Sequence, residues 1–362
     1  GFNYNHFFVI NETAIPTIDN AALPNLDITW ETNTTYDIGI DAEFLESNLK
    51  FTFDYFFRKR EDVIAGATAS VPSTLGVGLA AQNLYEFSNE GFEFSLDYQK
   101  QINKDLKLSG LLNFSRAREK AIFIDETLNE DPFMRANLTQ TGGYTNLRRG
   151  YISEGLFQTQ DEIDAHAIQD TNGNNSLQPG DVKYQDLNGD NIIDVKDQKV
   201  FGNGDKPAIN YSLNLGAEYK DFSLSVLFTG AAGYDIYLDG EAQSPLRNGF
   251  NGYDYQLDYW TPENTNAAYP RITDGGFNDN NYKYSDFWMR NGKHLRLKNI
   301  NLGYSVPLAD DSSFEKIQLF VTGYNLFVLK DYKEDFDPQN TSSVGWYYPQ
   351  TKSLTFGVNI TL

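Results

Sequence analysis

The sequence lacks cysteine altogether and has only two methionines and three histidines among its 362 residues. Without cysteine it can hold no disulfide framework and no thiolate nucleophile. The histidines, His6, His166 and His294, lie far apart and do not have the spacing of a zinc site. No phosphate-binding loop or dinucleotide fingerprint is present either. We therefore predict a protein that is not an enzyme.

Positive charge and long apolar runs are also scarce. The 29 Lys and Arg residues face 50 Asp and Glu, giving a net charge of −21 and excluding the basic face that nucleic acid requires. No apolar run reaches the ~18 residues of a spanning helix, but a membrane barrel needs only strands of ~10 alternating residues. No signal peptide is visible and the first residue is Gly1, so we expect a processed chain or a fragment.

Aromatic residues are abundant, at 15%, and apolar side chains alternate strictly with polar ones along much of the chain. In one such stretch Phe92, Phe94 and Leu96 alternate with Glu93 and Ser95. This period of two indicates β-strands with one apolar and one polar face. The pattern predicts strands over residues 36–44, 49–55, 92–98, 106–114, 211–219, 222–228, 300–306, 316–329 and 354–362.

The connections between these predicted strands alternate between short and long. The long ones are residues 61–90, 115–207, 239–293 and 331–350. Tight periplasmic turns alternating with long external loops are typical of outer-membrane barrels, and residues 1–34 would then form another external loop. Single-chain bacterial barrels use even numbers of strands. We therefore expect further strands upstream of Gly1, and a hairpin near "GYISEGLFQ" is a further candidate. A soluble β-sandwich is the alternative fold.

Six phrases, in order, resemble the C-terminal half of SusC/RagA-type TonB-dependent transporters of Bacteroidota. They are "LPNLDITWETNTTYDIGIDAEFL", "GYISEGLFQTQDEI" with "PGDVKYQDLNGDNIIDVKDQKVFGN", "DYWTPENTNAAYPRI", "SDFWMRNGKHLRLKNINLGYSVP", "FVTGYNLFVL" and "YYPQTKSLTFGVNITL". The resemblance covers most of residues 24–362. The family frequently ends in Phe, whereas this chain ends in Leu362, another large apolar residue.

The resemblance implies an all-β fold: about 9–11 antiparallel strands from the C-terminal part of a barrel of about 22. Residues 1–362 would be this portion, without the plug domain, the N-terminal strands or the segment that contacts TonB. The family imports oligomeric nutrients, glycans or peptides, across the Gram-negative outer membrane, often with a SusD-like surface lipoprotein. A structural barrel subunit of a larger assembly or secretion complex is the second hypothesis. A soluble calcium-binding sandwich or adhesin is the third.

The stretch "DLNGDNIIDVKD", within a predicted external loop at residues 161–200, matches the spacing of a calcium loop. Calcium prefers six to eight hard oxygen ligands, which this spacing curls around one point. Position 6 is Asn191 instead of glycine, and asparagine tolerates the left-handed conformation needed there. A solvated Asp/Asn/Gly turn is the simpler interpretation. The candidate ligands of a structural Ca²⁺ are Asp186, Asn188, Asp190, the carbonyl of Ile192, Asp194 and Asp197.

Aromatic residues concentrate in the predicted external loops. Aromatic faces beside Asn and Asp suit sugar or peptide recognition, although an interfacial girdle or packing among loops would use the same residues. The candidate substrate-binding residues are Tyr253, Tyr255, Tyr259, Trp260, Trp288 and Trp346. His294, Arg296 and Lys298 open a predicted strand, and as exposed cations they would meet anionic outer-membrane lipid at the external rim.

Overall fold

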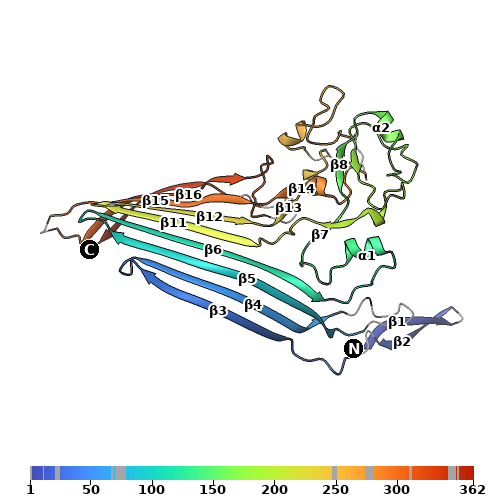
Figure 1. Ribbon diagram of the computed structural model, residues 1–362, viewed down its shortest axis with the longest axis horizontal. Coiled ribbons are helices and arrows are strands. Elements are labelled where there is room, and N and C mark those ends of the chain that lie inside the picture. Colours follow the sequence, from blue (N-terminus) through green and yellow to red (C-terminus); the bar gives the residue numbers. More distant parts are fainter. Residues whose placement is uncertain are drawn as a thin grey trace. The chain divides into compact units, whose positions relative to one another are not determined.

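The computed structural model describes residues 2–10, 12–20, 25–66, 69, 79–246, 251–273, 280–309, 312–340, 348 and 350–362. Its main element is an antiparallel sheet of nine strands that follow one another in chain order, with β3 and β17 at the edges (Figure 1). The strands are β3 (Thr32–Phe44), β4 (Leu49–Ala65), β5 (Gln82–Gln101), β6 (Leu106–Phe123), β11 (Ile209–Tyr219), β12 (Phe222–Ala232), β15 (His294–Ser305), β16 (Lys316–Lys330) and β17 (Ser353–Thr361).

All nine predicted strands are present, and the predicted mainly β fold is confirmed. Several strands extend beyond their apolar stretch: β5 begins at Gln82, not at Phe92. Charged residues continue the ladder there, and Lys59 lies 3.5 Å from Glu86 between β4 and β5. The hydrophobic pattern marks only the apolar band of a strand, because backbone pairing does not require apolar side chains.

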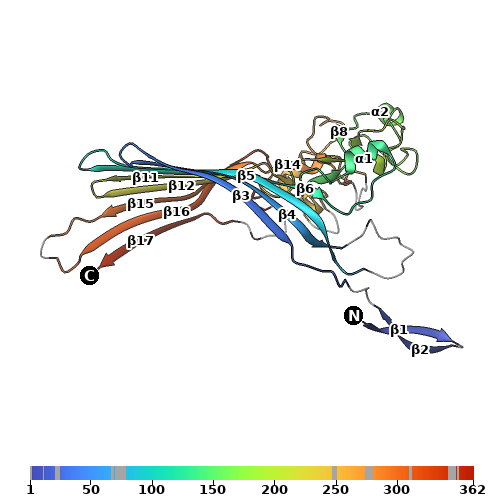
Figure 2. The ribbon, with the colours of Figure 1, turned by 60° about the horizontal axis from the view of Figure 1, so that its bottom comes forward.

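The register places apolar side chains opposite one another on one face. Leu213 lies opposite Leu112 of β6 and Phe228 of β12, while the alternate residue Ser212 lies opposite Asn113. Figure 2 shows β15, β16 and β17 running side by side to the C-terminus. No helix among the described residues is long and apolar enough to span a membrane.

A β-bulge in β15 changes which face its first residues occupy. The register shifts between Leu297 and Asn299, so Leu297 and Ile300 both lie opposite apolar-face residues of β12. His294 and Arg296 therefore turn to the opposite face from the one that strict alternation back from Ile300 predicts.

The chain forms two compact units, and β3 to β6 contribute to both. One unit comprises Gly1–Asp37, Phe56–Glu90 and Arg118–Thr145. It contains a hairpin of β1 (Phe2–Ile10) and β2 (Thr13–Asn20), and the helix α1 (Pro132–Leu138). The side chain of Asp131 caps α1 by accepting from two backbone N–H groups, and Pro132 occupies the first turn. The region expected to be an external loop at residues 1–34 thus contains a hairpin.

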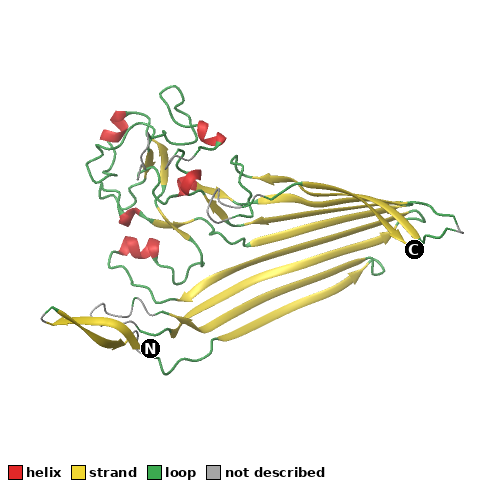
Figure 3. Cartoon of the chain, turned by 180° about the vertical axis from the view of Figure 1, so that it is seen from behind, coloured by secondary structure: helices red, strands yellow, loops and turns green. Residues whose placement is uncertain are grey.

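The second unit comprises Ile38–Tyr55, Gly91–Ala117 and Asn146–Leu362. Its long connections fold together at one end of β11, β12, β15 and β16, as Figures 1 and 3 show. We call this assembly, residues 146–208, 233–293 and 331–340, the loop body. Its elements are β7 (Arg148–Gly150), β8 (Ser153–Leu156), α2 (Gln160–Asp164), β9 (Val182–Tyr184), η2 (Val195–Asp197), β10 (Lys199–Phe201), β13 (Asp235–Tyr237), η3 (Gly240–Ala242), η5 (Asp254–Leu257), η6 (Asp286–Trp288) and β14 (Met289–Asn291).

The hairpin considered near "GYISEGLFQ" does not join the large sheet. Strands β7 and β8 occur there, but β7 pairs with β10 and β8 with β9 in two separate sheets. The loop body has its own apolar clusters: Trp288 and Leu238 are completely buried in one, and Phe157 in another. Most of the buried apolar side chains of the described residues therefore lie among the loops, and the sheet is buried mainly where β12, β15 and β16 meet the loop body.

Candidate functional site

The polar face of the nine-stranded sheet carries hydroxyl and carboxamide side chains that bond across strands. Asn113 donates to the Oγ of Ser212 at 3.3 Å, and Asn301 donates to the Oγ1 of Thr322 at 2.5 Å. Such pairs satisfy part of the hydrogen-bonding capacity of each side chain and leave the rest open to a solute. This face can therefore line an aqueous path.

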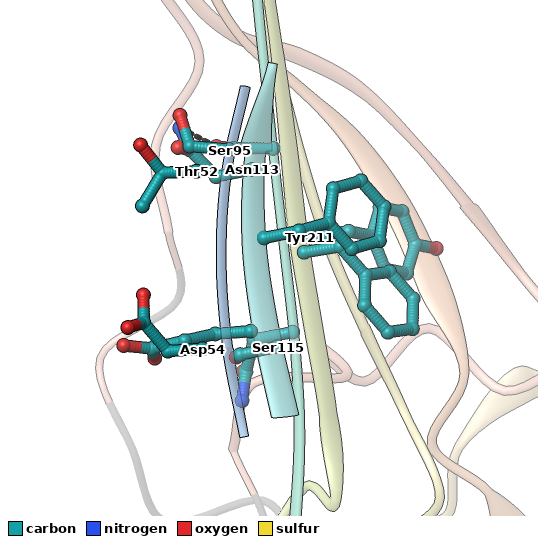
Figure 4. A pocket seen from close by; sticks show the side chains of 11 residues that line it. Thr52, Asp54, Ser95, Asn113, Ser115 and Tyr211 are labelled. Carbon is teal, nitrogen blue, oxygen red and sulfur yellow. Dashed lines mark hydrogen bonds between the residues drawn. The ribbon is translucent and has the colours of Figure 1, made fainter. Parts of the chain in front are cut away.

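A trough of about 440 Å³ lies on this sheet. Figure 4 shows Thr52, Asp54, Ser95, Asn113 and Ser115 on one side of the strands and Tyr211 on the other. Thr52 donates to Asp41 at 2.8 Å, which orients the hydroxyl between two strands. The trough's lining residues on the polar side offer hydroxyls, carboxamides and carboxylates but no cationic side chain, whereas Phe94, Phe114 and Tyr211 belong to the apolar face. Its lining residues are Thr52, Asp54, Glu93, Phe94, Ser95, Asn113, Phe114, Ser115, Asn210, Tyr211 and Ser212.

The opposite face of the sheet is apolar and open. Leu302 is 51% exposed, and Phe356 and Val358 on the edge strand are 71% and 56% exposed. A face of this kind is stable only against another apolar phase. A sheet with one polar and one apolar face, alternating residue by residue, has the pattern of a membrane-barrel wall, which an antiparallel sheet packed against a core shares.

A buried polar network holds two of the long connections together. Arg271 donates from Nε to Asp181 at 2.7 Å and from Nη2 at 3.2 Å, and Asp181 is fully buried. Asn281 donates to the same carboxylate at 2.9 Å and accepts from the backbone N–H of Val182 at 2.8 Å. This network cross-links residues 146–208 to residues 251–293, so the loop body is a single packed structure.

Five of the six candidate aromatic residues lie in the described part of the loop body. Trp288 is completely buried and donates from its ring nitrogen to the carbonyl of Asn281 at 2.7 Å. Tyr253 and Tyr255 stack at 5.5 Å against this core. Tyr259 and Trp260 keep part of their surface exposed. Trp346 lies outside the described residues, and substrate binding by this set stays a prediction.

The candidate calcium loop closes through its own carboxylates. Asp186 accepts from the backbone N–H groups of Gly189 and Asn191, at 2.7 and 2.9 Å. Asp190 and Asp194 accept from the backbone N–H groups two residues later, those of Ile192 and Lys196. Asn191 has a φ of 66°, the left-handed conformation that position 6 requires. The left-handed backbone at Asn191 and the oxygen-rich side chains therefore match two features of a calcium loop.

Asp197 is the buried end of this loop. It accepts from Leu187 at 2.8 Å, Asn188 at 3.2 Å and Asp194 at 2.9 Å. Burial raises its pKa above the usual value, against the effect of these N–H donors. Within the described part of the chain, no group of three or more His, Asp or Glu side chains converges closely enough to hold a metal. Calcium binding would require these carboxylates to exchange N–H donors for the ion, and it stays a prediction.

The prediction that His294 and Arg296 are exposed cations at the rim is wrong, because each residue is only 3% exposed. The β15 bulge turns both side chains under residues 331–340, where Arg296 donates to both carboxylate oxygens of Asp337 at 2.7 Å. Sequence alternation missed this because a bulge has no reliable local signature. The partners of the Asp181 network were also missed, since they lie about a hundred residues apart in the chain.

Comparison with known proteins decides the family of this chain. The family described as TonB dependent receptor-like, beta-barrel matches residues 2–192, just over half of the chain. The chain belongs to this TonB-dependent receptor family. That membership agrees with its two-faced antiparallel sheet, and the resemblance drawn from the six sequence phrases is confirmed.

Curated relatives of this TonB-dependent receptor chain cover nearly all of it. TonB-dependent receptor P3 of Formosa agariphila is 25% identical over 98% of this chain and 36% of the relative. TonB-dependent receptor SusC of Bacteroides thetaiotaomicron is 24% identical over 93% of this chain and 32% of the relative. The chain therefore spans about a third of the length of the curated relatives it matches.

Two solved structures share the fold. The RagAB peptide transporter matches with a TM-score of 0.71 at 20% identity, over 99% of this chain and 38% of that one. The RagAB peptide importer in its open-open state matches with a TM-score of 0.73 at 19% identity, over 100% and 37%. These similarities extend through the loop body as well as the sheet, because they cover the whole chain.

Proposed function

We propose that this chain is part of the wall and external mouth of an outer-membrane transporter that imports an oligomeric nutrient, a glycan or a peptide. The observation that supports it best is the sheet, with an open apolar face for lipid and a hydroxyl-rich face for an aqueous lumen. The packed loop body at one end of the strands provides a mouth against which a large solute can be held. Membership of the TonB-dependent receptor family supports energy coupling through TonB, by parts of the protein outside this chain.

The proposal includes a SusD-like lipoprotein as partner and a solute made of several units. Two relatives carry names that favour this, SusC and the RagAB peptide importer. Within the loop body, the partly exposed Tyr259 and Trp260 are the best placed of the candidate aromatic residues to contact the solute. Calcium in the loop at residues 186–197 would act as a structural clamp, with no part in recognition.

Growth tests the transport proposal. Cells that carry the full-length gene should grow on one class of oligomeric glycan or peptide as sole nutrient, and cells with the gene deleted should not. A tag on the full-length protein should copurify a surface lipoprotein. Unchanged growth across both classes, together with loss of a secreted or surface-assembled product, would instead favour the structural-subunit hypothesis. A chain that stays folded and monomeric without detergent would support a soluble sandwich.

A further inference from the structure

His294 sits at the start of β15 in an unusual environment for a histidine. Its ring is 3% exposed, and its Nδ1 lies 3.0 Å from the hydroxyl of Tyr234 and 3.2 Å from the carbonyl of Gly292. The Tyr234 hydroxyl has one proton, which it donates to the carbonyl of Pro338 at 2.5 Å. The Nδ1 of His294 must then carry the ring proton and act as the donor.

This assignment leaves Nε2 of His294 as a bare lone pair. That nitrogen is buried and has no hydrogen-bond partner among the described residues. A second proton would have to go on Nε2, where no described residue offers an acceptor. Burying an unpaired charge in this way is strongly unfavourable.

The charged groups around the ring do not relieve this penalty. Arg296, two residues along the same strand, is a cation, and its partner Asp337 is already engaged with it at 2.7 Å. Lys330 pairs with His294 across the β15–β16 ladder and donates to the carbonyl of Phe336 at 2.9 Å. From β11, the Tyr211 hydroxyl donates to the backbone carbonyl of His294 at 2.7 Å and does not contact the ring. Among the described residues, no carboxylate is hydrogen-bonded to the ring.

The same cluster holds the connection that follows β16. Asp337 is held by Arg296, and the carbonyl of Pro338 is held by Tyr234, which in turn contacts His294. The backbone N–H of Gln339 donates to the Asp337 carboxylate at 2.9 Å, and that of Asn340 donates to the Asp337 carbonyl at 3.1 Å. The far end of residues 331–340 is therefore seated directly over the histidine.

We propose that His294 is the sensor of a proton-sensitive latch: the neutral ring keeps residues 337–340 seated on β15, and protonation of the ring releases them. Release admits water to Nε2, so the charged ring is hydrated only in the open state. The latch lies beyond the proposed transport function and does not depend on which solute is carried. Its effect is to loosen one connection of the external mouth as the medium becomes acidic.

Linkage sets the direction and size of the effect. In the open state the imidazole is in water and binds a proton with an ordinary pKa near 6.5. The seated state binds none at the same pH, so acidification favours opening. From about pH 6.5 to 5.5 the opening equilibrium should rise about fivefold, and each further pH unit should raise it about tenfold, the full slope for uptake of one proton.

Amide hydrogen exchange of the full-length protein in detergent or nanodiscs tests the latch. After correction for intrinsic rates, the protection factors of Gln339 and Asn340 should fall about fivefold between about pH 6.5 and 5.5. Residues of the Trp288 core serve as an internal reference and should not change. A change of less than twofold in Gln339 and Asn340, or an equal change in the reference, would overturn the proposal.

Three variants separate the histidine from its surroundings. His294→Gln keeps an amide donor near Tyr234 but cannot titrate, so protection at residues 339 and 340 should become independent of pH. Tyr234→Phe should lower the protection of residues 339 and 340 at every pH and leave its dependence on pH unchanged. His166→Gln, the control in another part of the loop body, should leave both unchanged. If protection in folded His294→Gln still changes with pH, the latch is refuted. If that variant does not fold, the pH dependence measured in the unaltered protein decides.

Discussion

Arg271 donates from Nε to one carboxylate oxygen of Asp181 at 2.7 Å and from Nη2 to the other at 3.2 Å. The two residues lie ninety positions apart, in different long connections. Asp181 has 1% of its side chain exposed and Arg271 20%. This contact is one of several that pack the two connections into one structure, together with the hydrogen bonds of Asn280 to Gln169 and Tyr184. It also fixes the neighbouring backbone, because the N–H of Arg271 donates to the carbonyl of Gly180 at 2.9 Å.

Arg271→Ala should loosen the loop body, because it leaves a buried carboxylate with Asn281 as its main side-chain donor. Breaking a buried ion pair from one side typically costs about 3–5 kcal/mol. We expect faster protease cleavage within residues 146–208 and 251–273 while the barrel stays folded. Lys50→Ala is the control, since its partner Glu43 is 3.8 Å away and both side chains are more than half exposed. Equal cleavage of the two variants would contradict the network.

Gly180→Ala should destabilise the loop body more than Gly155→Ala. Both glycines have positive φ, 91° and 97°, so both substitutions carry backbone strain of about 1–2 kcal/mol. A Cβ at Gly180 would lie 2.5 Å from the Trp260 ring, whereas one at Gly155 has nothing within 4 Å. The difference in protease resistance between the two variants measures the Trp260 contact. Indole fluorescence should change only in Gly180→Ala.

Asp197→Asn and Asp186→Asn should affect the candidate calcium loop differently. Asp197 accepts three backbone N–H groups in its buried position, so its replacement should increase cleavage near residues 186–197 with or without calcium. Asp186→Asn removes a charge from an exposed ligand position, and its main effect should be weaker calcium binding by calorimetry. Because burial raises the pKa of Asp197, calcium should bind less well as pH falls. No heat of binding in the unaltered protein would refute the calcium site.

Acid should weaken the contact between residues 331–340 and β14 through Glu334. Burial alone would raise the pKa of Glu334, but the charge of Arg290 at 2.6 Å and the Tyr269 hydrogen bond outweigh it, so the pKa is lowered. A carboxyl group whose pKa is lowered on folding stabilises the folded state at pH values above its usual pKa of 4.5. That stability is lost as the pH falls below 4.5 and through the lowered pKa. Amide protection around Glu334 should therefore drop in that range. In Glu334→Gln, protection should be lower at neutral pH and the drop should disappear.

Leu302→Arg and Asn301→Arg place the same side chain on opposite faces of β15. In a lipid-embedded barrel, arginine on the apolar face costs about 2–4 kcal/mol near the bilayer midplane, whereas lumen positions tolerate charge. Urea unfolding of the full-length protein in lipid should show a large loss for Leu302→Arg and a small one for Asn301→Arg. Similar losses from both substitutions would contradict the assignment of the two faces.

The sequence by itself determined the strands, their alternation of faces and the order of short and long connections. These are local properties, because a period of two and a turn-rich interval can be recognised within a few residues. The six phrases that resemble the family and the left-handed conformation of Asn191 can likewise be recognised from short stretches of sequence. The apolar pattern predicted strands that are too short, because charged residues such as Lys59 and Glu86 continue β4 and β5 beyond their apolar stretches.

Only the tertiary structure decided what the long connections do. Trp288 is fully buried, and residues such as Asp181 and Asn281 find partners about a hundred positions away. The bulge at Leu297 turned His294 and Arg296 from an expected exposed rim into a buried cluster. Non-local pairing and a one-residue shift in register depend on the free energy of the whole packed arrangement, and a local pattern carries no record of either.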